Sequence, residues 1–446
     1  MLQHARFQNG RTLHSQACLS SRKIGQKQKD TWIYTKMLII DEVSFLDEDN
    51  LRKLDKHLRK LKEKDVMYGG VHVVFVGDFF QMLPVRGSPL YKNNTIQFNA
   101  INRAIFLNVS HRFSNDHLYG EIMRRFRIGK VTKEDIHMIN SRYYKNSDVV
   151  LPPLPKIRCA CYMNVERNAY NNVVFLEHLK ATHPQADALD ISPPMHTCII
   201  KANMKYGSKS IGSMNKSMYN HVLDQCADSD ITNGSGSFVD PALKFFYNVP
   251  LMMNTNARIE EELANGTPCR GLYIALKKGC TFVTENWEGY LVNTVLANQV
   301  AYIMCMHEGK NAKYFIVKPE TRQCKVKLRR WNNVVLDKLK VTYLPITSSI
   351  STTGHKLQGK TLDDLVINSW GYRCPHWVYV VLSRVRTLKS LILNVKLDEN
   401  RDYSAKVELL RWEKDMKSNV ESETFRMRGP LTYERYNKEE AQYSYK

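Results

Sequence analysis

The hydrophobic and polar positions near the start of the chain predict a strand, a helix and a second strand. Residues 37–40 and 73–76 are short apolar runs, and acidic residues follow each of them closely. Strands buried in a parallel sheet have this continuous apolar pattern. Between the runs, residues 47–64 carry four leucines at helical spacing opposite a basic face, and Asp47 stands at the expected N-cap. This order is typical of a right-handed crossover unit.

The following part of the chain continues this α/β pattern. Helical periodicity covers residues 116–128 and 132–144. A short apolar run at 157–162 predicts a strand, and a helix is expected to begin at Asn164. Residues 186–240 hold clusters of Pro, Gly, Ser and Asn with weak periodicity, which predict a loop-rich segment.

The pattern changes again in the second half of the chain. Residues 249–344 consist of short β-like runs broken by Gly, Asn and Pro, and such runs favour a small β-barrel insertion. The α/β pattern then resumes with apolar runs in 362–368, 377–385 and 388–395. From about Arg401 onward, a charged helix and a Tyr-rich, disordered end are expected.

Length and charge narrow the class of protein. A chain of 446 residues is too long for one hydrophobic core, and about two to four domains are expected. Lys and Arg number 65 against 44 acidic residues, which gives a net charge of +21. Because the basic residues run through the whole chain, a surface that binds a polyanion such as nucleic acid is the simplest interpretation. Organellar proteins and some scaffolds are also basic.

The cysteines and the apolar runs point to a soluble, intracellular protein. The ten cysteines form no C-x-x-C pair, so we expect reduced, packed thiols in place of a metal site or a disulfide framework. No apolar run approaches the roughly 18 to 20 residues of a membrane span. The N-terminus lacks the apolar core of a secretory signal.

Three polar residues follow the first two predicted strands. Asp41 and Glu42 end the first run, and Gln81 follows the second. Ligands of a parallel sheet sit beyond the carboxyl ends of its strands, so these side chains should gather at one edge. Phosphoryl transfer from a nucleotide needs a carboxylate for Mg²⁺, a group that orients water, and cations for the developing charge. Asp41 is suited to binding the metal, Glu42 is suited to orienting the water, and Gln81 can sense the γ-phosphate. A capped turn would give the same Asp-Glu pair.

The other half of a nucleotide site is missing from the sequence. The phosphate loop G-x-x-x-x-G-K-[ST] occurs nowhere in these 446 residues. This loop normally supplies a lysine, a nest of backbone N–H groups and a hydroxyl that shares the Mg²⁺. The pattern therefore predicts the acid-and-sensor half of a nucleoside-triphosphatase site.

Several sequence blocks resemble one family in their order and composition. IIDEVS at 39–44 and VGDFFQMLPV at 76–85 resemble motifs II and III of the petite-integration-frequency (Pif-one) family of superfamily 1 helicases. This RecD-related family includes the helicase domains of Helitron transposons. Further blocks are similar to later or flanking motifs: GRTLHS at 10–15, HRF at 111–113, NVERNAYN at 164–171, NG at 265–266, TTGHKLQGKT at 352–361 and YVVLSRVRTL at 379–388.

The resemblance assigns roles to further residues. Arg112 and Arg384 correspond to two arginine fingers, and Arg384 is expected at the end of a buried apolar strand. Gln358 and Gly359 would lie beside the nucleotide in the cleft between domains, together with Asp41, Gln81 and Arg384. The residues expected to contact DNA are Thr12, His14, His355 and Lys356.

The chain also departs from the family pattern. Leu357 replaces the usual serine of motif V, which removes a possible hydroxyl contact to DNA or nucleotide. In the family the phosphate loop precedes the block at 10–15, so the resemblance implies a chain truncated at its N-terminus. The first sheet would then carry an exposed apolar edge.

The fold that the resemblance implies is α/β, with two RecA-like parallel-sheet domains, the first incomplete, and a small β-barrel insertion in the second. The expected divisions are a partial first RecA-like domain at 1–112, the first part of the second at 113–248, the β-rich insertion at 249–344, the remainder of the second domain at 345–400, and a charged tail at 401–446.

The implied function is an ATP-dependent DNA helicase that uses ATP and Mg²⁺ and moves 5′ to 3′ on single-stranded or forked DNA. It would act as a monomer without a membrane, in repair, recombination, telomere maintenance or transposition. The nucleus is the expected compartment, with the mitochondrion as the alternative. Because the phosphate loop is missing, an inactive nucleic-acid-binding remnant is the second hypothesis. An incomplete sequence is the third, and genomic DNA upstream of Met1 would decide it.

Overall fold

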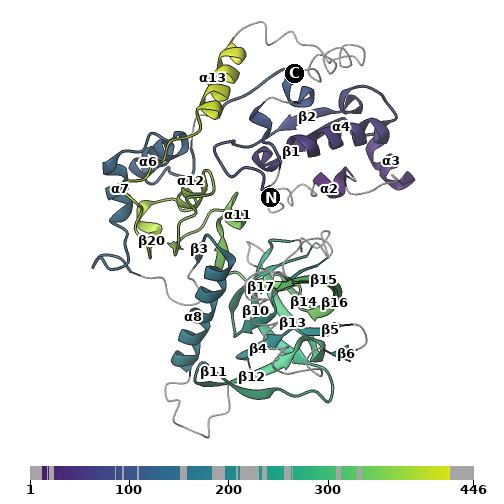
Figure 1. Ribbon diagram of the computed structural model, residues 1–446, viewed down its shortest axis with the longest axis vertical. Helices are drawn as coiled ribbons and strands as arrows, with labels where there is room; N and C mark the ends of the chain where they lie inside the picture. Colours follow the sequence, from purple (N-terminus) through teal and green to yellow (C-terminus); the bar gives the residue numbers. More distant parts are fainter. Residues whose placement is uncertain are drawn as a thin grey trace.

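The structure is a computed structural model (Figure 1). Two α/β units and a β-rich insertion make up the molecule; in Figure 1 the first unit lies at the upper right, the second at the left and the insertion at the bottom. The structure describes residues 13–17, 19, 25–85, 87–92, 95–107, 110–150, 158–182, 196–206, 209–210, 231–233, 239–255, 263, 265–307, 313–328 and 334–421.

The first unit contains the predicted strand, helix and strand. Strands β1 (Met37–Ile40) and β2 (His72–Phe75) pair in parallel, and α4 (Glu48–Lys62) connects them. The Asp47 side chain caps α4 by accepting a hydrogen bond from the backbone N–H of Asn50 at 2.9 Å. All four leucines of the helical stripe are buried against the sheet. The crossover prediction is confirmed.

One face of this sheet is exposed. Among the described residues the sheet has two strands, and alternate side chains such as Leu38 and Val73 pack into the core. On the opposite face, Met37, Ile39 and Val74 are 56%, 59% and 39% exposed. The prediction of strands buried on both faces is therefore wrong here. A continuous apolar run does not show whether the sheet is covered on one face or on both faces, because the run is unbroken in either case.

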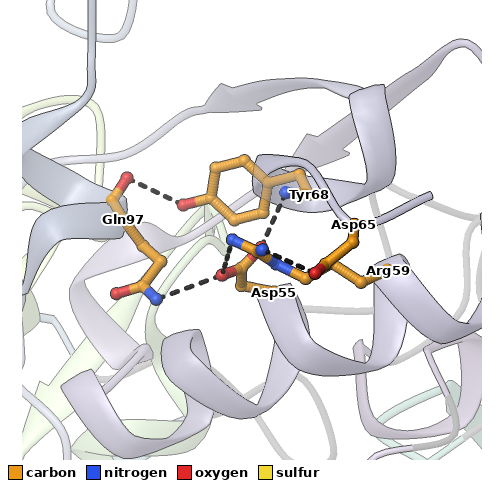
Figure 2. A network of polar contacts seen from close by, with 5 residues as sticks. All are labelled: Asp55, Arg59, Asp65, Tyr68 and Gln97. Carbon is orange, nitrogen blue, oxygen red and sulfur yellow. Dashed lines mark hydrogen bonds and ion pairs between the residues drawn. The ribbon is translucent and has the colours of Figure 1, made fainter. Parts of the chain in front are cut away.

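A buried carboxylate joins α4 to the segments that follow it (Figure 2). Asp55 is 2% exposed and accepts hydrogen bonds from the backbone N–H of Tyr68 at 2.6 Å and from Nε2 of Gln97 at 3.1 Å. Arg59 donates to both of its oxygens, each at 3.1 Å. The Tyr68 hydroxyl donates to the carbonyl of Gln97 at 2.8 Å. These bonds hold η3 (Met67–Gly70) and α5 (Ile96–Asn99) against α4.

The second unit is a four-stranded parallel sheet in the order β18-β3-β19-β20. The whole β-rich insertion separates β3 from β18 along the chain, yet the two strands are hydrogen-bonded neighbours. Its strands and main helices are β3 (Cys159–Cys161), β18 (Ser351–Thr353), β19 (Leu365–Ile367), β20 (Leu391–Leu393), α6 (His117–Ile128), α7 (Lys133–Asn140), α8 (Asn164–Thr182), α11 (Gly354–Leu357) and α12 (Trp377–Leu382).

One predicted strand of this unit is a helix. The run at 377–385 was expected to end in a buried strand at Arg384, but it forms α12, and Arg384 follows the helix. Five of the six residues of α12 are buried, so the helix lacks a polar face. A short apolar run without a polar face fits a buried helix and a buried strand equally well. Arg384 still lies at the end of this buried apolar run, as the sequence predicts.

Strands from before residue 249 pair with strands of the predicted β-rich segment. The described strands of the insertion form three sheets: β14-β13-β10-β9-β17, β11-β12-β4-β8 and β6-β5-β16-β15-β7. The bounds are β4 (Cys198–Lys201), β5 (Asn203–Tyr206), β6 (Lys209–Ser210), β7 (Ile231–Asn233), β8 (Ala242–Phe245), β9 (Val249–Met253), β10 (Pro268–Leu276), β11 (Val283–Trp287), β12 (Tyr290–Leu296), β13 (Val300–His307), β14 (Tyr314–Val317), β15 (Glu320–Leu328), β16 (Val334–Tyr343) and β17 (Ile346–Ser348).

The loop-rich prediction for residues 186–240 is wrong where the structure describes that range. β4 and β5 lie within it, and β4 pairs in parallel with β12, about ninety residues further along the chain. Such strands depend on distant partners, so local periodicity does not reveal them. The domain boundaries proposed above stay predictions.

The C-terminal part holds the expected charged helix, α13 (Val407–Glu421), and the Tyr-rich end lies outside the described residues. The eight cysteines that are described are all free thiols. Within the described ranges, no helix combines the length and apolarity needed to cross a membrane. The remaining short helices are α2 (Leu13–Gln16), α3 (Gln26–Ile33), η2 (Val43–Phe45), η4 (Leu90–Lys92), η6 (Ala297–Gln299) and η7 (Leu388–Ser390).

The Asp55 network generates a stability prediction. Asp55→Ala removes a buried acceptor and leaves Arg59 and Gln97 without it, so we expect the free energy of unfolding to fall by about 2–4 kcal/mol. Asp49→Ala on the same helix is the control, because that carboxylate is exposed and should change the value by about 0.5 kcal/mol. Urea unfolding followed by circular dichroism measures both. Equal losses in the two variants would contradict a structural role for the network.

Candidate functional site

The two strands of the first unit bring their carboxyl ends together. Glu42 adopts a left-handed backbone with φ of +53°, and its N–H donates to Oδ1 of Asp41 at 2.9 Å. The N–H of Val43 donates to the carbonyl of Val76 at 2.9 Å, which joins the two loops. Gly77 is required here, because its φ is +147° and a Cβ atom would lie 2.8 Å from the Val43 nitrogen.

Gln358 connects this edge to the second unit. Its Nε2 donates to Oε2 of Glu42 at 2.7 Å, and its Oε1 accepts from the backbone N–H of Met82 at 3.1 Å. The side chain is 5% exposed. At the next position, Gly359 has φ of +75°, and a Cβ atom there would stand 3.0 Å from Oε1 of Glu42. Gln358 and Gly359 therefore lie against the predicted water-orienting carboxylate.

Gln81 belongs to a tight turn beside this contact. Asp78 shapes the turn: its Oδ1 accepts from the N–H of Phe80 and its carbonyl from the N–H of Gln81, both at 3.0 Å. The side-chain Oε1 of Gln81 is buried and has no hydrogen-bond partner among the described residues. A buried acceptor without a partner is costly, so the position suits a ligand that donates a hydrogen bond, such as an ordered water.

Two arginines meet at Ser383, on the second unit's side of the contact. Arg384 is 2% exposed; its Nε donates to the carbonyl of Val380 and its Nη2 to Oγ of Ser383, both at 2.6 Å. Nη1 of Arg112 donates to the carbonyl of Ser383 at 2.7 Å. Neither guanidinium makes an ion pair within the described part of the chain.

The electrostatics of these arginines favour an anion. Burial, and then repulsion from Arg112, lower the pKa of Arg384 to about 10. Burial also lowers the pKa of Arg112, while the charge of Glu42 opposes the shift in both groups. A buried cation that lacks a carboxylate partner is costly, and a phosphate between the units would remove that cost.

The residues present also fit a magnesium ion bound together with phosphates. No group of three metal-ligating side chains occurs among the described residues. Mg²⁺ in nucleotide sites uses one or two carboxylates and completes its shell with phosphates and water. Asp41 is an exposed carboxylate at the strand end, next to Glu42, so it can serve as that single protein ligand.

The predicted DNA-contacting residues have different outcomes. Thr12 lies outside the described residues, and so does the side chain of His14, whose backbone belongs to α2. His355 and Lys356 both lie in α11. Burial lowers the pKa of His355. Burial, and then the charges of Arg167 and Lys360, lower the pKa of Lys356 to about 8. These two side chains are therefore not part of a solvated loop.

Lys356 belongs to a basic cluster of Arg167, Lys244, Lys356 and Lys360 around Asp240. Arg167 on α8 is 4% exposed, and burial lowers its pKa against the opposing charge of Asp240. Asp240 accepts a hydrogen bond from Oγ1 of Thr347 at 3.0 Å. Arg167 was visible in the block at 164–171. No local sequence pattern identifies Lys244 or Asp240, because only strand pairing brings β8 to the basic cluster.

Leu357 has a structural explanation. The side chain is 2% exposed and packs in the core of the second unit, with Met82 and Trp377 in the same cluster. Met82 follows β2 of the first unit, but its side chain is fully buried in this cluster of the second unit. An apolar residue at 357 therefore contributes to the contact between the two units.

Comparison with known proteins agrees with this arrangement. Residues 1–111 match the family described as PIF1-like helicase. The chain is similar to the Saccharomyces cerevisiae protein named ATP-dependent DNA helicase RRM3, at 26% identity over 223 residues, which is 47% of this chain and 29% of that protein. A second curated relative, from Emericella nidulans and named ATP-dependent DNA helicase PIF1, is matched over 16% of its length. The chain thus spans only a minor part of these relatives.

Solved structures are similar over most of the chain. A Pif1 helicase from Candida albicans has a TM-score of 0.64 at 18% identity, covering 92% of this chain and 85% of that one. A Pif1 helicase from Bacteroides, crystallised with ADP-AlF3 and ssDNA, has a TM-score of 0.61 at 19% identity, covering 93% and 85%. These likenesses concern the fold, and they confirm the predicted α/β class with RecA-like parallel-sheet domains. Residues 1–111, about a quarter of the chain, are thus similar to the PIF1-like helicase family.

Proposed function

We propose that this chain supplies the acid, sensor and arginine groups of an ATP-dependent DNA helicase, which couples ATP hydrolysis to 5′-to-3′ movement along single-stranded DNA. The observation that carries the proposal is the contact between the two α/β units, where Gln358 bonds Glu42 and the charge of Glu42 acts on Arg112 and Arg384. The names of the curated relatives, ATP-dependent DNA helicases, support the same activity. The Bacteroides protein, crystallised with a nucleotide analogue and ssDNA, supports both ligands.

Each residue of the site has a role in this proposal. Asp41 holds Mg²⁺, which neutralises phosphate charge when bound. Glu42 orients the attacking water, and Gln81 bonds the γ-phosphate from the turn at the end of β2. Arg112 and Arg384 stabilise the charge that develops on the transferred group. Gln358 and Gly359 close on the nucleotide from the second unit.

The basic cluster is the proposed site for the DNA backbone. Its cations come from α8, β8, α11 and the segment that follows α11, and phosphate oxygens would stabilise them together with the charge of Asp240. His355, and also Thr12 and His14, are proposed to contact the same strand. We further propose that the protein acts as a monomer on single-stranded or forked DNA in the nucleus or, alternatively, in the mitochondrion. Repair, recombination, telomere maintenance and transposition all use such a motor.

The second candidate is a nucleic-acid-binding protein without hydrolysis. One observation favours it: the 446 residues contain no phosphate loop. The basic cluster needs no nucleotide, so DNA binding is expected under either proposal. A measurement of ATP hydrolysis distinguishes the two proposals.

The first test measures DNA-stimulated ATP hydrolysis. We expect negligible turnover by the 446-residue chain, because its sequence contains no phosphate loop to hold the β- and γ-phosphates. A chimera in which a strand, phosphate loop and helix from a PIF1-like relative precede residue 10 should hydrolyse ATP. Glu42→Gln in the chimera should reduce turnover by about 10² to 10⁴.

The control for this test is Glu121→Gln, which changes an exposed carboxylate on α6 and should leave turnover unchanged. A folded chimera that binds DNA but hydrolyses no ATP would favour the non-hydrolytic candidate. Robust turnover by the 446-residue chain, lost in Glu42→Gln, would show that the phosphate loop is dispensable.

The second test uses the pKa of Lys356, which is about 8. The ammonium group is charged below this pH and neutral above it, so affinity for single-stranded DNA should fall as the pH rises from 7 to 9. Loss of one phosphate contact corresponds to about a tenfold weaker binding. Fluorescence anisotropy with a labelled oligothymidylate at constant salt measures it. Lys356→Arg should abolish the pH dependence, because arginine stays charged; a dependence equal to wild type in that variant would exclude Lys356 as its source.

A further inference from the structure

Arg127 on α6 reaches from the second unit to the first. Its Nε donates to Oδ2 of Asp78 at 2.9 Å and its Nη2 to Oδ1 at 2.8 Å, which is a bidentate contact. The guanidinium carbon also lies 4.2 Å from the centre of the Phe80 ring. α6 packs in the core of the second unit, whereas Asp78 and Phe80 belong to the turn after β2. The contact therefore crosses between the units.

The other arginines of α6 show that this crossing is specific to Arg127. Arg124 bonds Glu121 on the same helix, and Arg125 bonds Asp135 on α7. Both pairs stay within the second unit. Of these three arginines, Arg127 alone reaches the turn that holds Gln81.

The C-terminal helix supports Arg127 from the far side. Nη2 of Arg127 also donates to Oε1 of Glu413 on α13 at 2.9 Å. One residue earlier, the Trp412 ring packs against Phe79 with 4.9 Å between ring centres, and Leu409 is fully buried. α13 follows β20, the last strand of the second unit, yet its apolar side packs on the first; in Figure 1 it lies at the end of the molecule opposite the insertion.

The turn that Arg127 holds is part of the candidate site. Asp78 accepts the N–H groups that shape residues 78–81, and the next N–H, that of Met82, donates to Gln358. Gln358 in turn bonds Glu42. Polar contacts thus run without interruption from Glu413 through Arg127 and the turn to Glu42. Burial lowers the pKa of Arg127, but the bonds and charges of Asp78 and Glu413 outweigh it and raise the pKa, so the guanidinium stays charged.

We propose that Arg127 is a positioning residue for the segment 78–82, and that α13 is a strap that holds Arg127 against this segment. The proposal rests on the proposed function only in that Gln81 within the segment contacts the nucleotide. When the two units separate, α6 moves away from β2. This movement must break the Arg127–Asp78 pair and disturb the turn that contains Gln81. Conversely, an intact strap keeps the turn in its site-forming arrangement.

Hydrogen–deuterium exchange of the full chain, followed by mass spectrometry, tests the proposal without any nucleotide. In Arg127→Ala we expect exchange in residues 79–84 to become about tenfold faster, because the turn loses its bidentate anchor. Exchange in α13 should rise as well, while α4 and the insertion stay at the wild-type rate. Arg127→Lys keeps the charge but loses the fork, so it should show an intermediate increase. Arg124→Ala is the matched control and should leave residues 79–84 unchanged.

Leu409→Ala tests the strap separately, because Leu409 is fully buried on α13 and takes part in neither ion pair. Faster exchange in residues 79–84 as well as in α13 would support the strap. Exchange that rises in α13 alone would overturn it. For Arg127→Ala, an unchanged exchange rate in residues 79–84 would overturn the positioning role. An equal increase of the exchange rate across the whole chain would also overturn it. Because neither readout needs hydrolysis, failure here is distinguishable from failure of the helicase proposal.

Discussion

The hydrogen bond from Gln358 to Glu42 is the contact on which the candidate site depends. It holds the carboxylate at 2.7 Å, and the same amide receives the N–H of Met82, so one side chain fastens both loops of the first unit to the second. Gln358 is neutral, and therefore it orients Glu42 without cancelling its charge. A lysine or arginine at this position would form an ion pair and remove the carboxylate from any reaction with water.

Among the described residues, the short helix α11 and the residue after it contact two groups of cations. α11 is followed by Gln358, which faces Glu42 near Arg112 and Arg384, and it carries Lys356, which faces the basic cluster. Both groups place cations close to one another, so we propose that both bind phosphates. A movement of α11 would change the two sites together. This arrangement gives the proposed motor a direct physical connection between nucleotide and DNA.

The sequence predicts those parts whose pattern is local. β1, α4 and β2 follow from an apolar run, a leucine stripe and a capping aspartate, and the acidic residues at the strand ends follow from the rule for parallel sheets. α12 was mistaken for a strand because a short buried run has no polar face in either structure. β4, Lys244 and the Arg127–Asp78 pair could not be predicted, because distant partners determine where they lie.

Half of a nucleotide site is still a site with physical consequences. Arg384, which makes no ion pair within the described residues, is costly to bury unless an anion is bound. Contacts between the two units offset part of this cost: the buried Met82, the Gln358 bond and the strap from α13. The units therefore hold an anion-binding arrangement together without the phosphate loop. In this chain, contacts between the units hold Glu42, the turn of Gln81 and Arg384 at one place.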